Sequence, residues 1–207
     1  MKREITGVFL MVVIVGFSFM NTAMRSSVVQ NNGQFDLVGI DQAVYQGVAK
    51  CKTCHKKVEQ GEQYGIWQKT AHAKAYETLA GDKAKEYGAA VGIDSPQEDP
   101  ACLKCHVTGY GVDPEFLGKK YKIEDGVGCE SCHNAGQNYY KKKTMIALVK
   151  GEITPESVGL KIPDEATCLT CHNDESPAFK GFNFEEAKAK IAHPIPEATK
   201  AEILAGK

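Results

Sequence analysis

One five-residue pattern, Cys-x-x-Cys-His, occurs four times in this chain and constrains its fold more than any other feature. The copies span residues 51–55, 102–106, 129–133 and 168–172, and together they use all eight cysteines. In this pattern the two thiols bond to the vinyl groups of haem c, and the adjoining histidine reaches the iron as its proximal ligand. The sequence therefore predicts four covalently attached haem c groups.

The residues that this pattern assigns fall into two sets. The predicted haem-attaching cysteines are Cys51, Cys54, Cys102, Cys105, Cys129, Cys132, Cys168 and Cys171. The predicted proximal iron ligands are His55, His106, His133 and His172.

Two other chemistries use paired cysteines: a zinc site with four thiolates, and a thiol redox centre or disulfide framework. Neither requires a histidine directly after the second cysteine of every pair. The chain has six histidines in 207 residues. Four such placements by chance have a likelihood on the order of one in a million on composition alone. The spacing therefore favours haem over zinc and over disulfides.

The N-terminus has the layout of an export segment. Lys2 and Arg3 precede an apolar run from Ile5 to Met20, as in a secretory signal. The run is close to, but shorter than, the roughly 20 residues that span a bilayer. We expect residues 1–26 to be a signal peptide or an uncleaved membrane anchor. In either case the body of the chain would be exported to a periplasmic or other extracytoplasmic compartment.

Charge excludes one class of partner. The chain has 25 Lys plus Arg against 26 Asp plus Glu, whereas a nucleic-acid-binding protein presents a concentrated basic face. We therefore expect no nucleic-acid partner. The one basic cluster, residues 141–143, is interpreted as a solvated turn or as a landing place for an acidic redox partner.

The pattern of apolar residues predicts a mostly α fold with long irregular connections and little or no β structure. We expect a flexible leader over residues 27–46 and one compact multihaem cytochrome domain over residues 47–207. Apolar side chains are scattered, so four haems would form most of the core, and the haem-free chain would be largely unfolded.

Local signals place several helices. A 3.6-residue period over 63–80 predicts a helix that contains His72, with Gly81 as its C-terminal cap. Asp99-Pro100 predicts the start of a short helix that carries the second motif. Further helices are predicted to begin at Pro155, at Asp164 and at Asn183, the last ending near residue 192.

Counting histidines limits the iron ligands. Outside the motifs only His72 and His193 remain. We expect both to be distal ligands, so that two haems have two histidines each; the alternative is that either is an ordinary surface or core residue. The other two irons would take Met, Lys, Tyr, water or nothing, or would borrow a ligand from another chain. Met145 is the one methionine after the N-terminal segment, and an open iron would bind small molecules.

Four segments resemble the tetrahaem cytochrome c-554 family, the electron acceptors of hydroxylamine oxidation in ammonia-oxidising bacteria. They are residues 67–75, 105–111, 126–133 and 182–193. The resemblance extends over nearly all of the chain from about Gly47.

The resemblance implies specific ligation. It pairs His72 with His133 and His193 with His172, and it implies a five-coordinate iron on His106. At the position of the family's distal ligand for the first haem, this chain has Lys143. Asn134-Ala135 likewise replaces the family's Gly-Pro after the third motif.

These observations lead to one expected function and two alternatives. We expect an exported electron carrier between redox partner proteins rather than an enzyme. The first alternative is a small-molecule reductase, acting on nitric oxide or another nitrogen oxide at the open His106 haem, which would then take a small gaseous ligand. The second is a haem-chain subunit of a larger or polymeric assembly.

Overall fold

The computed structural model describes residue 39 and residues 42–206 of the chain. The predictions for residues 1–26 and for most of the leader fall outside this part. Within it, ten α-helices are joined by 3₁₀ turns and irregular segments, and no strand forms. One isolated parallel bridge joins Tyr45 to Leu117. The predicted mostly α class with little or no β structure is confirmed.

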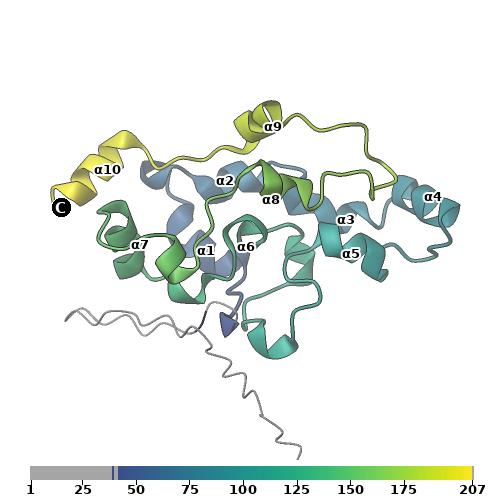
Figure 1. The fold of residues 1–207 in the computed structure, drawn as a ribbon, viewed down its shortest axis with the longest axis horizontal. Coiled ribbons are helices and arrows are strands. Elements are labelled where there is room, and N and C mark those ends of the chain that lie inside the picture. The colour runs from purple at the N-terminus through teal and green to yellow at the C-terminus, as the bar shows by residue number, and fades with distance from the viewer. Residues whose placement is uncertain (1–38, 40–41, 207) are drawn as a thin grey trace, which may run out of the picture. The chain divides into compact units, whose positions relative to one another are not determined.

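The helices are short and follow the chain in the order drawn in Figure 1. Their bounds are α1 Val48–His55, α2 Gln63–Gln68, α3 Ala75–Thr78, α4 Asp82–Ala90, α5 Pro100–His106, α6 Cys129–His133, α7 Lys142–Val149, α8 Glu165–Leu169, α9 Phe184–Ile191 and α10 Glu197–Leu204. The 3₁₀ turns are η2 Val58–Gln60, η3 His72–Lys74, η4 Pro114–Phe116, η5 Ile123–Asp125, η6 Gly136–Asn138 and η7 Glu156–Val158. Helix α10 lies beside α7, and α3 lies beside α5 (Figure 1).

Polar caps begin the helices that the sequence marks most clearly. The side chain of the residue just before each helix accepts a hydrogen bond from the backbone N–H of the second or third helical residue. It thereby satisfies a donor that the helix leaves unpaired. These bonds measure 2.8, 2.9 and 3.1 Å and run from Ala101 to Asp99, from Thr167 to Asp164 and from Glu186 to Asn183. The predicted starts of α5, α8 and α9 are confirmed.

The single helix predicted over residues 63–80 is wrong. The chain leaves the helix after Gln68, where both the backbone N–H and the hydroxyl of Thr70 donate to the carbonyl of Trp67, at 2.9 and 2.7 Å. This local bonding competes with the helical ladder. His72 then opens the 3₁₀ turn η3, and Gly81 stands before α4 as its N-cap instead of ending a helix.

Helix α7 begins inside the basic cluster that was interpreted as a turn. Lys141 is its N-cap, and Lys142 and Lys143 form its first turn, all three exposed. Positive charge at a helix N-terminus opposes the helix dipole, and no side chain caps this end. The helix is amphipathic enough to pack its Thr144 and Ala147 into the interior.

The protein's own hydrophobic core is small. One cluster of buried side chains consists of Leu79, Leu103 and Val107, with Tyr76 and Ile123 among the half-buried side chains packed against it. In residues 42–206 the largest side chains less than 2% exposed are no bigger than those of Val158 and Thr144. A domain of this size normally buries far more apolar side chain, so the chain alone makes the thin core that the sequence predicts.

A buried carboxylate joins the third motif to the start of the first. Glu130, only 4% exposed, accepts hydrogen bonds from the backbone N–H groups of Gln46 (2.7 Å), Gly47 (2.8 Å) and Gly136 (2.6 Å). Burial raises the pKa of Glu130, while the three donors oppose that shift. Because Gly47 directly precedes α1, these bonds hold α1 against α6.

Asn134 has a backbone conformation that suits glycine. Its φ of 64° and ψ of 175° lie in a region that non-glycine residues occupy only at a cost of about 1–3 kcal/mol. The chain tolerates this conformation because the Tyr139 hydroxyl donates to the carbonyl of His133 (2.9 Å) and of Asn134 (2.5 Å). The resemblance noted above implies glycine at this position.

We expect Asn134→Gly to stabilise the holoprotein. Relief of the strained φ outweighs loss of the exposed bond from Asn134 Nδ2 to the Gly159 carbonyl at 3.2 Å, for a net gain of about 1 kcal/mol. The unfolding temperature, followed by circular dichroism, should rise by about 2–4 °C. Asn134→Ala, which keeps the strain and loses the bond, is the control and should lower it. An Asn134→Gly protein no more stable than the parent would contradict this account.

Candidate functional site

Short helices present three of the four motifs. α1, α5 and α6 each contain a whole motif, and the fourth motif begins in the last residues of α8 and continues past its end. In a helical turn, residues i, i+3 and i+4 lie on one face. The two thiols and the imidazole of a motif therefore point to the same side, as binding the edge and the iron of one haem requires.

The thiols of the first and third motifs meet. All eight cysteines are free, and all but the exposed Cys54 are half-buried. A hydrogen bond between the thiols of Cys51 and Cys129 raises the pKa of Cys51 and lowers the pKa of Cys129. Partial burial lowers the pKa of the His133 imidazole, and the nearby ring of His55 adds to this shift. The first and third motifs are thus neighbours.

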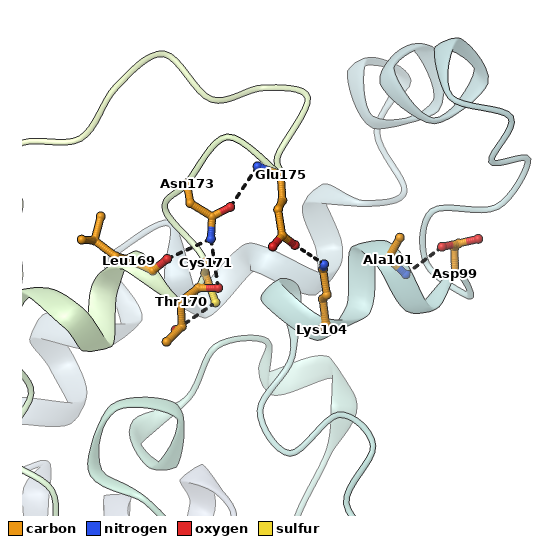
Figure 2. A network of polar contacts seen from close by, with 8 residues as sticks. All are labelled: Asp99, Ala101, Lys104, Leu169, Thr170, Cys171, Asn173 and Glu175. Atoms are coloured by element: carbon orange, nitrogen blue, oxygen red, sulfur yellow. Dashed lines mark hydrogen bonds and ion pairs between the residues drawn. The ribbon is translucent and has the colours of Figure 1, made fainter.

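The second and fourth motifs meet in the same way. Burial, with the nearby Cys171 thiol, raises the pKa of Cys105 to about 11. Beside these thiols, Lys104 of α5 forms an ion pair with Glu175, which raises the pKa of Lys104 and lowers that of Glu175 (Figure 2). This ion pair links α5 to the loop that follows the fourth motif.

Asn173 shapes that loop. Its Nδ2 donates to the carbonyls of Leu169 (2.8 Å) and Thr170 (3.3 Å), and its Oδ1 accepts the N–H of Glu175 at 2.9 Å (Figure 2). The turn directs Glu175 toward Lys104. It is a local device that holds the end of the fourth motif against the second.

The third and fourth motifs are also close. Burial raises the pKa of the Cys132 thiol, and the charges of Cys168 and Cys171 add to the shift. Hydrogen bonds between thiols therefore join the first motif to the third and the second to the fourth, and Cys132 of the third lies within electrostatic range of both cysteines of the fourth.

Four histidines direct Nδ1 at a protein oxygen. The acceptors are the carbonyls of Ala75 for His106 (2.7 Å), Lys161 for His133 (2.9 Å) and Ile191 for His193 (2.7 Å), and the side-chain oxygen of Gln63 for His55 (3.2 Å). An imidazole that donates from Nδ1 presents Nε2 as a lone pair, and this arrangement orients metal-bound histidines. His172 is instead stacked on Phe182, with ring centres 4.8 Å apart.

The two histidines outside the motifs each face a motif histidine. The ring centres of His72 and His172 are 5.9 Å apart, and those of His133 and His193 are 6.0 Å apart. A histidine nitrogen binds a metal ion at about 2 Å, so two imidazoles on opposite sides of one ion have ring centres about 6 Å apart. Both pairs fit a haem iron between them.

This arrangement differs from the pairing that the family resemblance implies. His72 faces His172, not His133, and His193 faces His133, not His172. The backbone explains the position of His72, since its carbonyl accepts the N–H of Val127 at 3.0 Å. A side chain on Gly126 would collide with that same carbonyl.

The remaining candidate iron ligands do not form such pairs. His55 and His106 form no ring pair with a second histidine within the described residues. Met145 lies half-buried in α7, and Lys143 lies exposed in its first turn. In residues 42–206 no three His, Cys, Asp or Glu side chains converge to hold a metal ion. A haem iron needs at most two protein ligands because the porphyrin supplies four.

The residues present fit haem c. The thiols are free, four of the six imidazoles present Nε2, and the protein core leaves apolar bulk to be supplied. Comparison with known proteins agrees: the sequence model of the family Cytochrome c554 and c-prime matches residues 50–134. Cytochrome c-554 of Nitrosomonas europaea is 34% identical over 167 residues, covering 75% of this chain and 67% of the relative. The chain belongs to the cytochrome c-554 family.

This cytochrome is therefore a haem electron-transfer protein with covalently bound haem c. No solved structure matches it. Among the residues that the structure describes, no helix is both long and apolar enough to cross a bilayer. The N-terminal apolar run lies outside those residues.

Several residues of the site were not anticipated from the sequence. Three of the Nδ1 acceptors are backbone carbonyls, which any residue supplies, so no side-chain pattern marks them. Gln63 was anticipated only as the first residue of a predicted helix, and Phe182 only as part of a segment that resembles the family; neither was given a role at a haem. The Lys104–Glu175 ion pair joins residues 71 positions apart, and nothing in the linear spacing connects them.

We expect charge reversal at Lys104 or Glu175 to loosen the loop after the fourth motif. In Lys104→Glu two carboxylates meet, and in Glu175→Lys two ammonium groups meet. Because the pair is exposed, the effect should be a few-fold. Limited proteolysis of the holoprotein should cleave residues 173–181 faster in each single variant at low salt.

The double reversal should restore the parental cleavage rate, since it re-forms the pair. Lys200→Glu, which breaks an ion pair inside α10, is the matched control and should leave cleavage at 173–181 unchanged. Equal cleavage in all variants would show that the ion pair does not hold this loop.

Proposed function

We propose that this cytochrome is an exported, periplasmic electron carrier that holds four haem c groups and passes electrons along them between redox partner proteins. The observation that carries the proposal is the set of contacts between motifs. Each thiol is a point of covalent attachment. Motifs whose thiols touch would therefore carry haems whose edges are close.

The contacts support one haem order: first, third, fourth, second. Cys51 with Cys129 would join the first haem to the third. Cys132, near Cys168, would join the third to the fourth, and Cys105 with Cys171 would join the fourth to the second. The first and second haems then stand at the two ends, where electrons would enter and leave.

The histidine pairs support unequal ligation. His172 with His72, and His133 with His193, would hold two irons from both sides. His55 and His106 would each hold an iron from one side. Haem c supplies the redox chemistry, a one-electron change at iron whose potential depends on the axial ligands. The protein would attach each haem, orient it and shield it from water.

Export is supported by the sequence before the cytochrome domain. Lys2 and Arg3 followed by an apolar run is the layout of a secretory signal. Export would also bring all eight cysteines to the outside of the cytoplasm, where haem would be attached. N-terminal sequencing of the purified protein would show whether this segment is cleaved.

Mass spectrometry of the purified protein tests the haem count directly. We expect a mass excess of four haems, and a loss of one haem when both cysteines of any motif are replaced by serine. Electron paramagnetic resonance of the oxidised protein should show two low-spin bis-histidine irons. Nitric oxide added to the oxidised protein, or carbon monoxide added after reduction with dithionite, should bind the remaining irons only. Four low-spin irons inert to both gases would contradict the ligand assignment.

The ligand pairs can be tested one at a time. We expect His72→Ala to convert the haem on Cys168 and Cys171 from low-spin to high-spin, because its iron loses the ligand opposite His172. NMR contacts between that haem's methyl groups and the Phe182 ring identify it, since Phe182 stacks on His172. His193→Ala, the matched variant, should instead affect the haem on Cys129 and Cys132. The reverse result would restore the pairing implied by the family resemblance.

A further inference from the structure

The loop after the first motif brings one side chain back to the motif's histidine. Residues 56–62 lead from α1 through the turn η2 to α2, whose first residue is Gln63. The Oε1 atom of Gln63 lies 3.2 Å from Nδ1 of His55. Both side chains are half-buried.

The Gln63 amide is held in one orientation. Its Nε2 donates to the carbonyl of Gln60, so Oε1 is the atom that faces His55. An oxygen can only accept, and the imidazole must then donate from Nδ1. The tautomer of His55 that presents Nε2 as a lone pair is thereby selected.

The backbone around Gln63 is built for this placement. Gly61 has φ of 102°, and Glu62, a non-glycine residue, has φ of 49°, a conformation that L residues rarely adopt. A Cβ on Gly61 would lie 2.7 Å from Gln63 Nε2 and 2.4 Å from the Pro194 carbonyl. The C-terminal segment braces the loop further, since the Thr199 hydroxyl donates to the Glu59 carbonyl.

This acceptor differs from the others. His106 and His133 donate to backbone carbonyls, which substitution cannot remove. Only His55 among the four motif histidines donates to a side chain. The first haem is therefore the one whose axial histidine the sequence can adjust through a single residue.

We propose that Gln63 is a positioning residue for the haem of the first motif: its amide oxygen fixes the tautomer of His55 and sets how strongly that imidazole donates to iron. The inference rests on the proposed function, because it requires a haem on Cys51 and Cys54. A stronger acceptor on the outer nitrogen makes the ligating nitrogen more basic, and a more basic ligand favours oxidised iron. A weaker acceptor does the opposite.

The test is a redox titration of the holoprotein, followed by optical spectroscopy and by NMR of the haem methyl groups. Gln63→Glu should lower the potential of the His55 haem alone, changing its ratio of oxidised to reduced iron about tenfold at fixed potential, or about 59 mV for one electron. Gln63→Met, which removes the acceptor, should raise the potential of the same haem. Gln68→Glu adds the same charge five residues along α2, at an exposed position, and should shift it much less.

Each result bears on the inference. Shifts of opposite sign in Gln63→Glu and Gln63→Met support it, because a structural defect would not change sign with the acceptor. Shifts of equal sign, no shift, or a Gln68→Glu shift as large as that of Gln63→Glu would overturn it. If Gln63→Met fails to load haem, Gln63→Glu against Gln68→Glu alone decides. The haem count by mass spectrometry separates failure of this inference from failure of the proposed function.

Discussion

Contact between cysteine thiols of different motifs is the constraint on which the rest of this structure depends. Cys51 meets Cys129 and Cys105 meets Cys171, although each pair joins distant parts of the sequence. A thiol that attaches haem leaves the porphyrin edge little freedom, so these contacts would set the distances between haems. The polar anchors act on the same arrangement. Glu130 holds the first motif to the third, and Lys104 with Glu175 holds the second to the fourth.

The small core explains why so many of these anchors are polar. A cluster built on Leu79, Leu103 and Val107 cannot order more than 160 residues by apolar burial alone. Backbone bonds to buried groups, such as those of Glu130 and Thr108, fix the segments that carry the motifs. Haem c would add the missing apolar contacts, so attachment of the cofactor and folding are expected to be coupled.

The sequence predicted those helix starts that depend on hydrogen bonds between neighbouring residues. Asp99, Asp164 and Asn183 begin helices because each caps a backbone donor within its own segment. The helix predicted through Gln68 and His72 ends where Thr70 bonds to the Trp67 carbonyl. A contact 60 residues away, from the Trp67 indole N–H to the Val127 carbonyl at 2.8 Å, then fixes this segment in the fold. Helix α7 was not predicted because its lysines lie at its N-terminus, where positive charge opposes the helix dipole. The candidate ligands followed from motif spacing and a histidine count, but their pairing did not, since it depends on how His72 and His193 reach distant motifs.

The C-terminal segment returns to the loop that follows the first motif. Pro194 and Thr199 contact residues 59–61, beside the first haem-attachment motif, and His193 faces the third. The first motif is among the earliest parts of the domain to be synthesised, yet the loop that carries Gln63 gains its brace from almost the last. A chain interrupted before residue 193 would have every cysteine in place and still lack this brace. The loop that carries Gln63 therefore takes up its braced position only once the C-terminal segment has been made.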